Sequence, residues 1–139
     1  MPYPEMMVAP MRQDMLRIGC TELKTPQDVD DVLAKDTRTI LLAVNSVCGC
    51  SAGMMRPGLY LSLQGDGKKP EVLTTVFAGQ DMEATERARE YITGYPPSSP
   101  CVALFKGGDL VWMMERHQIE GHYAEDIAEA LQAAYAEHC

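Results

Sequence analysis

The sequence has no long apolar run and no excess of positive charge. No stretch reaches the roughly 18 apolar residues that a helix needs to cross a bilayer, so a membrane partner is not expected. Lys and Arg number 12 against 20 Asp and Glu, which gives a net charge of -8. Nucleic acid is bound mainly through Lys and Arg, so this balance argues against it as a partner. The first five residues lack the basic start and apolar stretch of a secretion signal, and a cytoplasmic protein is therefore expected.

The sequence also lacks internal repeats, low-complexity tracts and an even set of cysteines. Its five cysteines are Cys20, Cys48, Cys50, Cys101 and Cys139. An odd count does not suit a closed disulfide framework. In a reducing compartment, cysteines are more often buried apolar residues, metal ligands or redox groups. A length of 139 residues is enough for one domain with a core, so a single domain over residues 1–139 is expected.

Apolar patterns predict an α/β protein. Residues 39–44 form an almost unbroken apolar run, typical of a strand buried on both faces of a sheet, and residues 72–77 form a second β-branched run. The first ten residues are expected to wrap the surface. Helices are expected over 10–18, from a Thr25-Pro26 cap, over 51–63 with a kink at Pro57, after a cap at Asp81, and around 127–135. An edge strand is expected over 20–23 and a hairpin around Gly107-Gly108.

This order of elements predicts the fold class. Two apolar strands joined through a helix imply a right-handed parallel crossover. The terminal hairpin and helix then complete a mixed sheet with helices on both faces. The expected architecture is a thioredoxin-like three-layer α/β sandwich.

Cys48 and Cys50 stand where the buried strand gives way to a helix. Free amide N–H groups and the positive end of the helix dipole stabilise a thiolate there, so its pKa should fall. The thiolate is the nucleophile in disulfide exchange. Gly49 forms the turn between the two cysteines because glycine tolerates most backbone angles. We expect Cys48 to attack and Cys50, further into the helix, to resolve the mixed disulfide.

Two other readings of the pair stay open. The first is a metal-binding module with Cys48 and Cys50 as thiolate ligands, completed by Cys101 or by a second chain. The second is a weak protein disulfide isomerase. A metal site at His117, Glu120 and His122 is disfavoured, because Gly121 intervenes and helical ligand spacing is lacking. Cys20 is expected to be structural. For Cys101 we weigh two roles, a small buried strand residue or a third redox thiol.

Several stretches resemble the bacilliredoxins, small bacterial thioredoxin-like proteins with a Cys-Gly-Cys centre. The similarity spans nearly the whole chain, and the stretches that carry it are residues 44–53 (VNSVCGCSAG) with Arg56-Pro57, 75–81 (TVFAGQD), 94–100 (GYPPSSP) and 115–121 (ERHQIEG). The resemblance implies a thiol–disulfide oxidoreductase that removes bacillithiol or a similar low-molecular-weight thiol from thiol-modified proteins. It maps the attacking cysteine onto Cys48 and the second cysteine onto Cys50. No organic cofactor is expected, and the sequence leaves a homodimer open.

Residues 99–108 resemble the segment of thioredoxins that begins with a cis-proline. The resemblance predicts a cis Ser99–Pro100 bond and a substrate-binding role for both residues, with the backbone of Ser99 facing Cys48. Leu42 stands where thioredoxins carry a buried Asp, so no carboxylate base is expected beneath the pair. For Arg56 we weigh two roles, binding an anionic thiol ligand or carrying a solvated surface charge.

Overall fold

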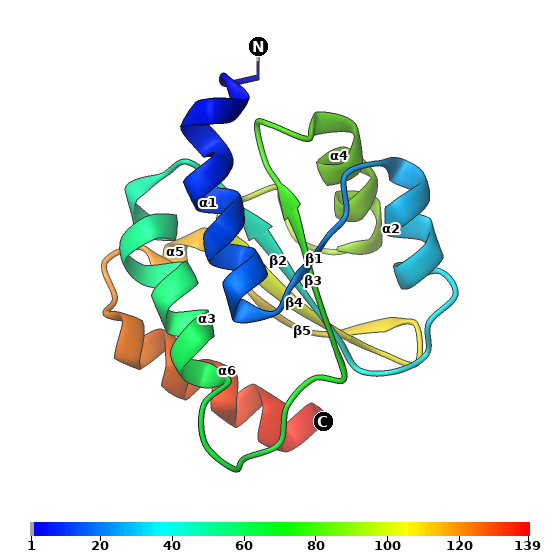
Figure 1. Ribbon diagram of the computed structural model, residues 1–139. Coiled ribbons are helices and arrows are strands. Elements are labelled where there is room, and N and C mark those ends of the chain that lie inside the picture. Colours follow the sequence, from blue (N-terminus) through cyan, green and yellow to red (C-terminus); the bar gives the residue numbers. More distant parts are fainter. Residues whose placement is uncertain (1) are drawn as a thin grey trace.

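The computed structural model describes residues 2–139 and contains one five-stranded mixed sheet (Figure 1). The strand order is β1-β3-β2-β4-β5, with β1, β2 and β3 parallel and β4 and β5 antiparallel to their neighbours. The strands are β1 (Thr21–Glu22), β2 (Ile40–Asn45), β3 (Val72–Phe77), β4 (Cys101–Lys106) and β5 (Asp109–Met114). The expected edge strand, the two apolar strands and the hairpin are therefore confirmed.

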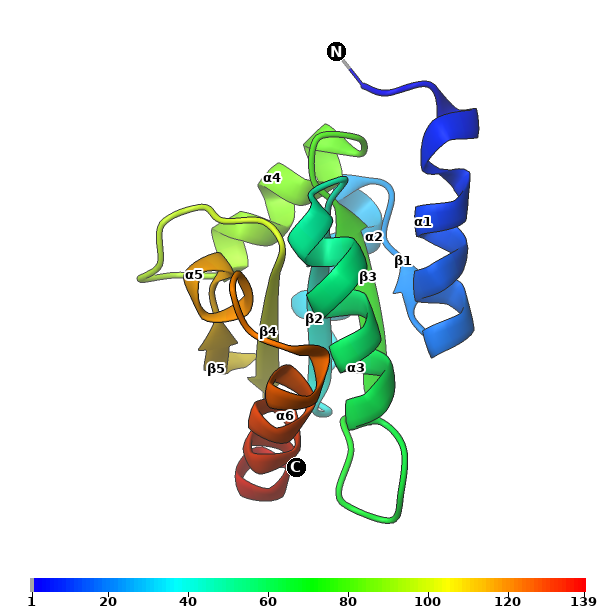
Figure 2. The same ribbon diagram turned by 90° about the vertical axis from the view of Figure 1, so that its left-hand side faces the viewer.

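Helices cover both faces of the sheet, which confirms the three-layer α/β sandwich. Figure 1 shows α2 (Pro26–Leu33) and α4 (Met82–Tyr91) on the right of the sheet, and α3 (Arg56–Ser62) and α6 (Ala124–His138) on the left. Figure 2, turned by 90°, shows α1 (Glu5–Ile18) next to α3, and the short α5 (Arg116–Ile119) beyond β5. Within residues 2–139, no helix is both long and apolar enough to cross a membrane.

Strand β2 is buried along its whole length because each face of the sheet carries a separate core. Its side chains alternate between the two cores, as the period of a strand requires. Leu41 and Ala43 pack with α3 and α6, whereas Leu42 and Val44 pack with α2 and α4. This alternation explains why the sequence of the strand is apolar throughout rather than at every second residue.

Helix α1 differs from the prediction. It begins at Glu5 rather than near Pro10, so most of the first ten residues are helical. Pro10 lies inside the helix on an exposed side, where the one backbone hydrogen bond that it removes is tolerated. Val8 is fully buried, and Glu5 pairs with the buried Arg12. These two contacts hold the first turns of the helix, and sequence pattern alone did not reveal them.

The two predicted helix caps have different outcomes. The hydroxyl of Thr25 accepts a hydrogen bond from the backbone N–H of Asp28, and Pro26 is the first residue of α2, as expected. Asp81 precedes α4, but its carboxylate makes no capping bond. It accepts two hydrogen bonds from Arg12 at 2.7 and 2.9 Å instead. A buried guanidinium is a stronger donor for a carboxylate than a backbone amide, so α1 is tied to the start of α4.

The helix after the cysteines starts irregularly. Its first part, η1 (Ser51–Met55), is π-helical, and a regular α-helix follows from Arg56. Pro57 lies in the first turn of α3, just after this change in helix type, and the kink expected there stays a prediction. Gly58 allows α3 to approach α6 closely, because a Cβ atom there would lie 2.7 Å from Cγ2 of Ile127.

Candidate active site

The cysteine pair lies at the carboxyl end of β2, at the beginning of the helix that continues into η1. The backbone N–H groups of Ser51 and Ala52 donate to the Cys48 carbonyl at 2.9 and 3.3 Å, so Cys48 is the residue from which the helix starts. Cys48 is half-buried, Gly49 is exposed and Cys50 is 6% exposed. The expected position of the pair at a strand-to-helix junction is therefore present in the structure.

Both cysteines are free thiols, and their sulfur atoms lie 2.7 Å apart. The pKa of Cys48 is lowered, chiefly by the hydrogen bond from the Cys50 thiol and then by the Cys50 backbone N–H. Burial, and then the neighbouring Cys48, raise the pKa of Cys50 to about 11. Cys48 therefore ionises first, and the Cys50 proton stabilises its thiolate.

A hydrogen-bonded network behind the turn holds the end of β2 against the helix. The side-chain oxygen of Asn45 accepts from the Ser46 N–H at 3.0 Å and from the Ser51 hydroxyl at 3.1 Å. The hydroxyl of Ser46 in turn accepts from the backbone N–H of Cys48 at 3.1 Å. All three polar residues are buried, so this network fixes the position of the Cys48 backbone.

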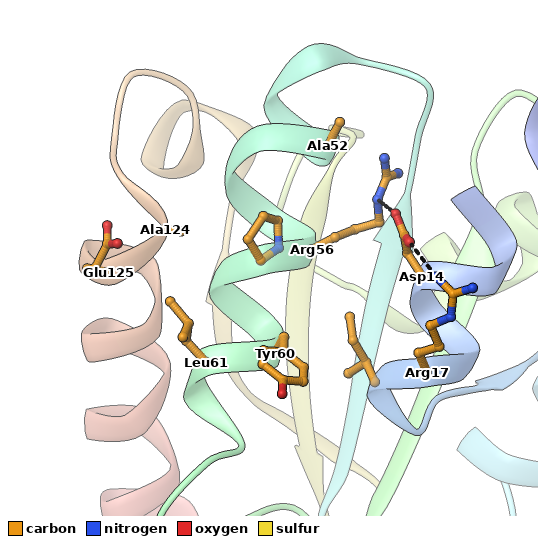
Figure 3. A pocket seen from close by; sticks show the side chains of 10 residues that line it. Asp14, Arg17, Ala52, Arg56, Tyr60, Leu61, Ala124 and Glu125 are labelled. Atoms are coloured by element: carbon orange, nitrogen blue, oxygen red, sulfur yellow. Dashed lines mark ion pairs between the residues drawn. The ribbon is translucent and has the colours of Figure 1, made fainter. Parts of the chain in front are cut away.

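Arg56 supplies the positive charge of this network and is 5% exposed, so the expectation of a solvated surface charge is wrong. Its Nη1 donates to Oδ1 of Asn45 at 2.8 Å and to the Ser46 carbonyl at 3.2 Å. Figure 3 shows Asp14 of α1 between Arg56 and Arg17, with ion-pair distances of 3.3 and 3.9 Å. The guanidinium lies behind the cysteine turn, and its hydrogen bonds are to the turn rather than to either sulfur.

Arg56 also borders a pocket of about 480 Å³ on the outer surface of α3. The pocket is walled by side chains of α1, α3 and the start of α6, among them Ile18, Tyr60 and Leu61 (Figure 3). Neither Cys48 nor Cys50 lines it. A role for Arg56 in ligand binding therefore stays a prediction, and one that concerns this neighbouring surface.

Arg116 is the site residue that the sequence reasoning missed. Its Nη2 lies 3.3 Å from Sγ of Cys48, and its positive charge contributes to the lowered pKa of that thiol. It is the first residue of α5, a four-residue helix that was not predicted. The two residues are 68 positions apart, and no spacing rule connects them. The only signal was the stretch ERHQIEG, quoted above for its family resemblance.

The Ser99–Pro100 bond is cis, as predicted. The Ser99 carbonyl accepts a hydrogen bond from Nη1 of Arg116 at 3.3 Å. The same guanidinium contacts Cys48, so it joins the cis-proline loop to the cysteine pair. The loop and the pair are therefore neighbours, as the resemblance to thioredoxins requires.

The other three cysteines are buried or half-buried. Cys101 is buried in the core on the opposite face of the sheet, where burial raises its pKa to about 11. Cys20 is buried, and Cys139 is half-buried against the core on the α3 side. Cys101 therefore cannot complete a metal site with Cys48 and Cys50. Among residues 2–139, no group of three or more His, Cys, Asp or Glu side chains is placed to hold a metal ion.

No carboxylate of the described residues hydrogen-bonds to either sulfur, which agrees with the absence of the Asp found in thioredoxins. Leu42 itself faces the core of α2 and α4, whereas Cys50 belongs to the core on the α3 side. The residues of β2 that face the side of the cysteines are Leu41 and Ala43. Leu42 therefore does not lie on the side of the cysteines, and the two β2 residues that do are apolar.

Comparisons with known proteins agree with this geometry. A family model described as "Disulphide isomerase" matches residues 3–139. The bacilliredoxin of Salinibacter ruber is 48% identical over 140 residues, covering 100% of this chain and 82% of the relative. The bacilliredoxin of Cytophaga hutchinsonii is 50% identical over 135 residues, covering 97% and 98%.

Solved structures with the same fold include thioredoxins. Mitochondrial thioredoxin 3 from Saccharomyces cerevisiae, in its oxidised form, matches with a TM-score of 0.58 at 18% identity, covering 89% of this chain and 98% of that one. Thioredoxin from Malassezia sympodialis matches with the same TM-score at 16% identity, covering 86% and 90%. The chain thus belongs to the bacilliredoxin family, has a thioredoxin fold, and has a role of the thiol–disulfide oxidoreductase kind.

Proposed function

We propose that this protein reduces mixed disulfides between proteins and a low-molecular-weight thiol, bacillithiol or a similar one, with Cys48 as the nucleophile. The observation that carries the proposal is the environment of the Cys48 sulfur. Cys48 is half-buried rather than enclosed, and its sulfur receives the Cys50 thiol proton, a backbone N–H and the charge of Arg116. These contacts favour a thiolate that a substrate can still reach. We place the reaction in the cytoplasm, where such thiols stay reduced.

The first step transfers the small thiol onto the enzyme. The Cys48 thiolate forms a new S–S bond to the sulfur of the small thiol, and the S–S bond to the target protein breaks. The bonding pair leaves on the sulfur of the target, which takes up a proton. Ser99 and Pro100 border the site through the contact of Arg116 with the Ser99 carbonyl, which supports a role for this loop in holding the target.

The second step releases the small thiol. Cys50 loses its proton and attacks the Cys48 sulfur, and the small thiol leaves as a thiolate. The Cys50 sulfur lies 2.7 Å from the Cys48 sulfur, so Cys50 is within reach of the mixed disulfide. The two thiols of the enzyme have then given up two electrons, so two equivalents of an external monothiol, or one dithiol, must reduce the Cys48–Cys50 disulfide. Because burial raises the pKa of the Cys50 thiol, direct attack of an external thiol on the Cys48 mixed disulfide is a competing route.

The test uses a carrier protein whose single cysteine bears a small thiol. Wild-type protein should release the thiol, and mass spectrometry should find the carrier reduced. Cys50→Ser should accumulate the adduct of the small thiol on Cys48, and Cys48→Ser should be inactive. Cys139→Ser, at the last residue of the sequence, is the matched control and should behave as wild type. Release that is unaffected by Cys48→Ser would exclude the proposal.

A weak protein disulfide isomerase activity is the second candidate, favoured by the description of the matching family model. Isomerisation needs an attacking thiolate but no net oxidation of the enzyme. It should therefore depend on Cys48 and tolerate Cys50→Ser, whereas reduction by the two-thiol route requires both cysteines. Refolding of a protein with scrambled disulfides, assayed with each variant, separates the two activities.

A further inference from the structure

Arg116 borders the space that a disulfide must enter to reach Cys48. The side chain is 45% exposed, and it contacts the Cys48 sulfur through Nη2 and the Ser99 carbonyl through Nη1. Its backbone N–H is 3.4 Å from the hydroxyl of Ser98, so the start of α5 is tied to the cis-proline loop. The guanidinium is therefore held beside the sulfur and is still open to solvent.

A carboxylate of the protein already occupies this guanidinium. Nε and Nη2 of Arg116 donate to one oxygen of Glu120, at 3.2 and 2.9 Å. Glu120 is the residue after the end of α5, and its side chain is 59% exposed. Such a pair gains little from Coulomb attraction in water, so a carboxylate from outside can replace Glu120 at small cost. The planar fork of an arginine suits this exchange because it matches the geometry of a carboxylate.

We infer that Arg116 determines specificity for the small thiol, by binding a carboxylate on it in the place that Glu120 occupies in the free protein. The inference rests on the proposed function and adds the residue that recognises the small thiol through its carboxylate. In the first step the sulfur of that thiol becomes bonded to the Cys48 sulfur. The Cys48 sulfur lies 3.3 Å from Nη2 of Arg116 in the free protein. A carboxylate a few bonds from that sulfur then lies within reach of the guanidinium.

The position of Arg116 favours recognition of the small thiol rather than of the target protein. The carbonyl of Ser99, which borders the cis-proline loop, is already paired with Nη1, and the backbone of a target would approach that loop. Nε and Nη2 donate to Glu120, and Nη2 also contacts the Cys48 sulfur. The donors that hold a carboxylate are therefore distinct from Nη1, which contacts the Ser99 carbonyl.

The test compares two substrates that differ only in charge. One carrier protein is modified with 3-mercaptopropionate and, in a second preparation, with 3-mercaptopropionamide. For each, kcat/KM for release is divided by the rate constant with dithiothreitol, which removes the difference in chemical reactivity. The wild-type ratio of carboxylate to amide is expected to lie between about 1.5 and 5, because an exposed ion pair contributes about 0.2–1 kcal/mol and displacement of Glu120 offsets part of that gain. This preference should shrink at high salt, because exposed charges are screened.

The variants isolate the carboxylate contact from the effect of Arg116 on the thiolate. Arg116→Gln should slow both substrates, because Cys48 loses a stabilising charge, and should bring the ratio to about one. Arg116→Lys should keep part of the preference, and Glu120→Gln should raise it by removing the competing carboxylate. Arg38→Gln removes one positive charge at the opposite end of β2 and should leave the ratio unchanged.

The outcomes separate this inference from the proposed function. If wild-type protein and Arg116→Gln release both thiols with the same ratio, the inference is wrong while the reductase function stands. If Cys48→Ser releases the thiols as fast as wild type, the proposed function itself is wrong. A ratio that falls equally in Arg38→Gln would show a general effect of charge and would also overturn the inference.

Discussion

Arg56 offers the sharpest test of how the fold positions the cysteine turn. Replacement by methionine removes the guanidinium and keeps an unbranched apolar side chain in the same space. The matched control is Arg17→Met, because both arginines pair with Asp14 but only Arg56 is buried. Their side chains are 6% and 76% exposed. A difference between the two variants therefore reports the buried network rather than the shared carboxylate.

The magnitude follows from the contacts that are lost. The hydrogen bond from Nη1 to Asn45 is 2.8 Å long and charge-assisted, a kind of bond that contributes roughly 1.5–3 kcal/mol. The longer hydrogen bonds and the ion pair with the half-exposed Asp14 contribute less. Burial of the Arg56 charge is unfavourable and lowers its pKa, so removal of this charge offsets part of the lost stability. Arg56→Met should therefore lower the free energy of unfolding by about 2 kcal/mol, and Arg17→Met by at most about 0.5 kcal/mol.

Urea denaturation measures the stability, and alkylation of Cys48 as a function of pH measures the consequence for the site. Without Arg56 the Ser46 carbonyl loses a donor, and the turn that presents the backbone N–H groups to Cys48 is less constrained. The pKa of Cys48 should then move upward toward that of an ordinary thiol. Equal stability of the two variants, within about 0.5 kcal/mol, would refute the reasoning that burial makes Arg56 the structural member of the pair.

Three further predictions concern packing and pH. Gly58→Ala should destabilise the protein by up to about 2 kcal/mol, because its clash with Ile127 costs about 1–3 kcal/mol and a helix-propensity gain of about 1 kcal/mol offsets part of that cost. At Gly53 an added Cβ meets no atom within 4 Å, so Gly53→Ala should not lower the melting temperature. Because its pKa is lowered, Cys48 should alkylate with a midpoint below pH 9, the ordinary thiol value, and a midpoint at or above 9 would contradict the site geometry. Burial raises the pKa of Cys20 from 9.0 to about 12, so its contribution to stability is complete below pH 9 and is lost as the pH rises toward 12. Between pH 8 and 10 wild-type protein should lose about 1.4 kcal/mol more than Cys20→Ala, and equal losses in urea denaturation would contradict this.

The sequence was informative wherever one short segment carries the whole signal. The apolar run of β2, the Thr25-Pro26 start of α2 and the glycine turn of the hairpin each depend on neighbours within a few residues. The same holds for the cysteine pair, because a strand end followed by a helix start was readable from local pattern. Resemblance added the cis Ser99–Pro100 bond, for which no local physical signal exists.

Tertiary structure alone decided which charged side chains serve the site. Arg116, 68 positions away, touches Cys48, and Arg56 is buried beneath the turn although an arginine on a helix is usually solvated. In the same way Asp81 pairs with Arg12 rather than capping its own helix. Local sequence determines the backbone conformations that a segment prefers. The partner of a long polar side chain depends instead on where the packed cores place distant segments, and that is a property of the whole chain.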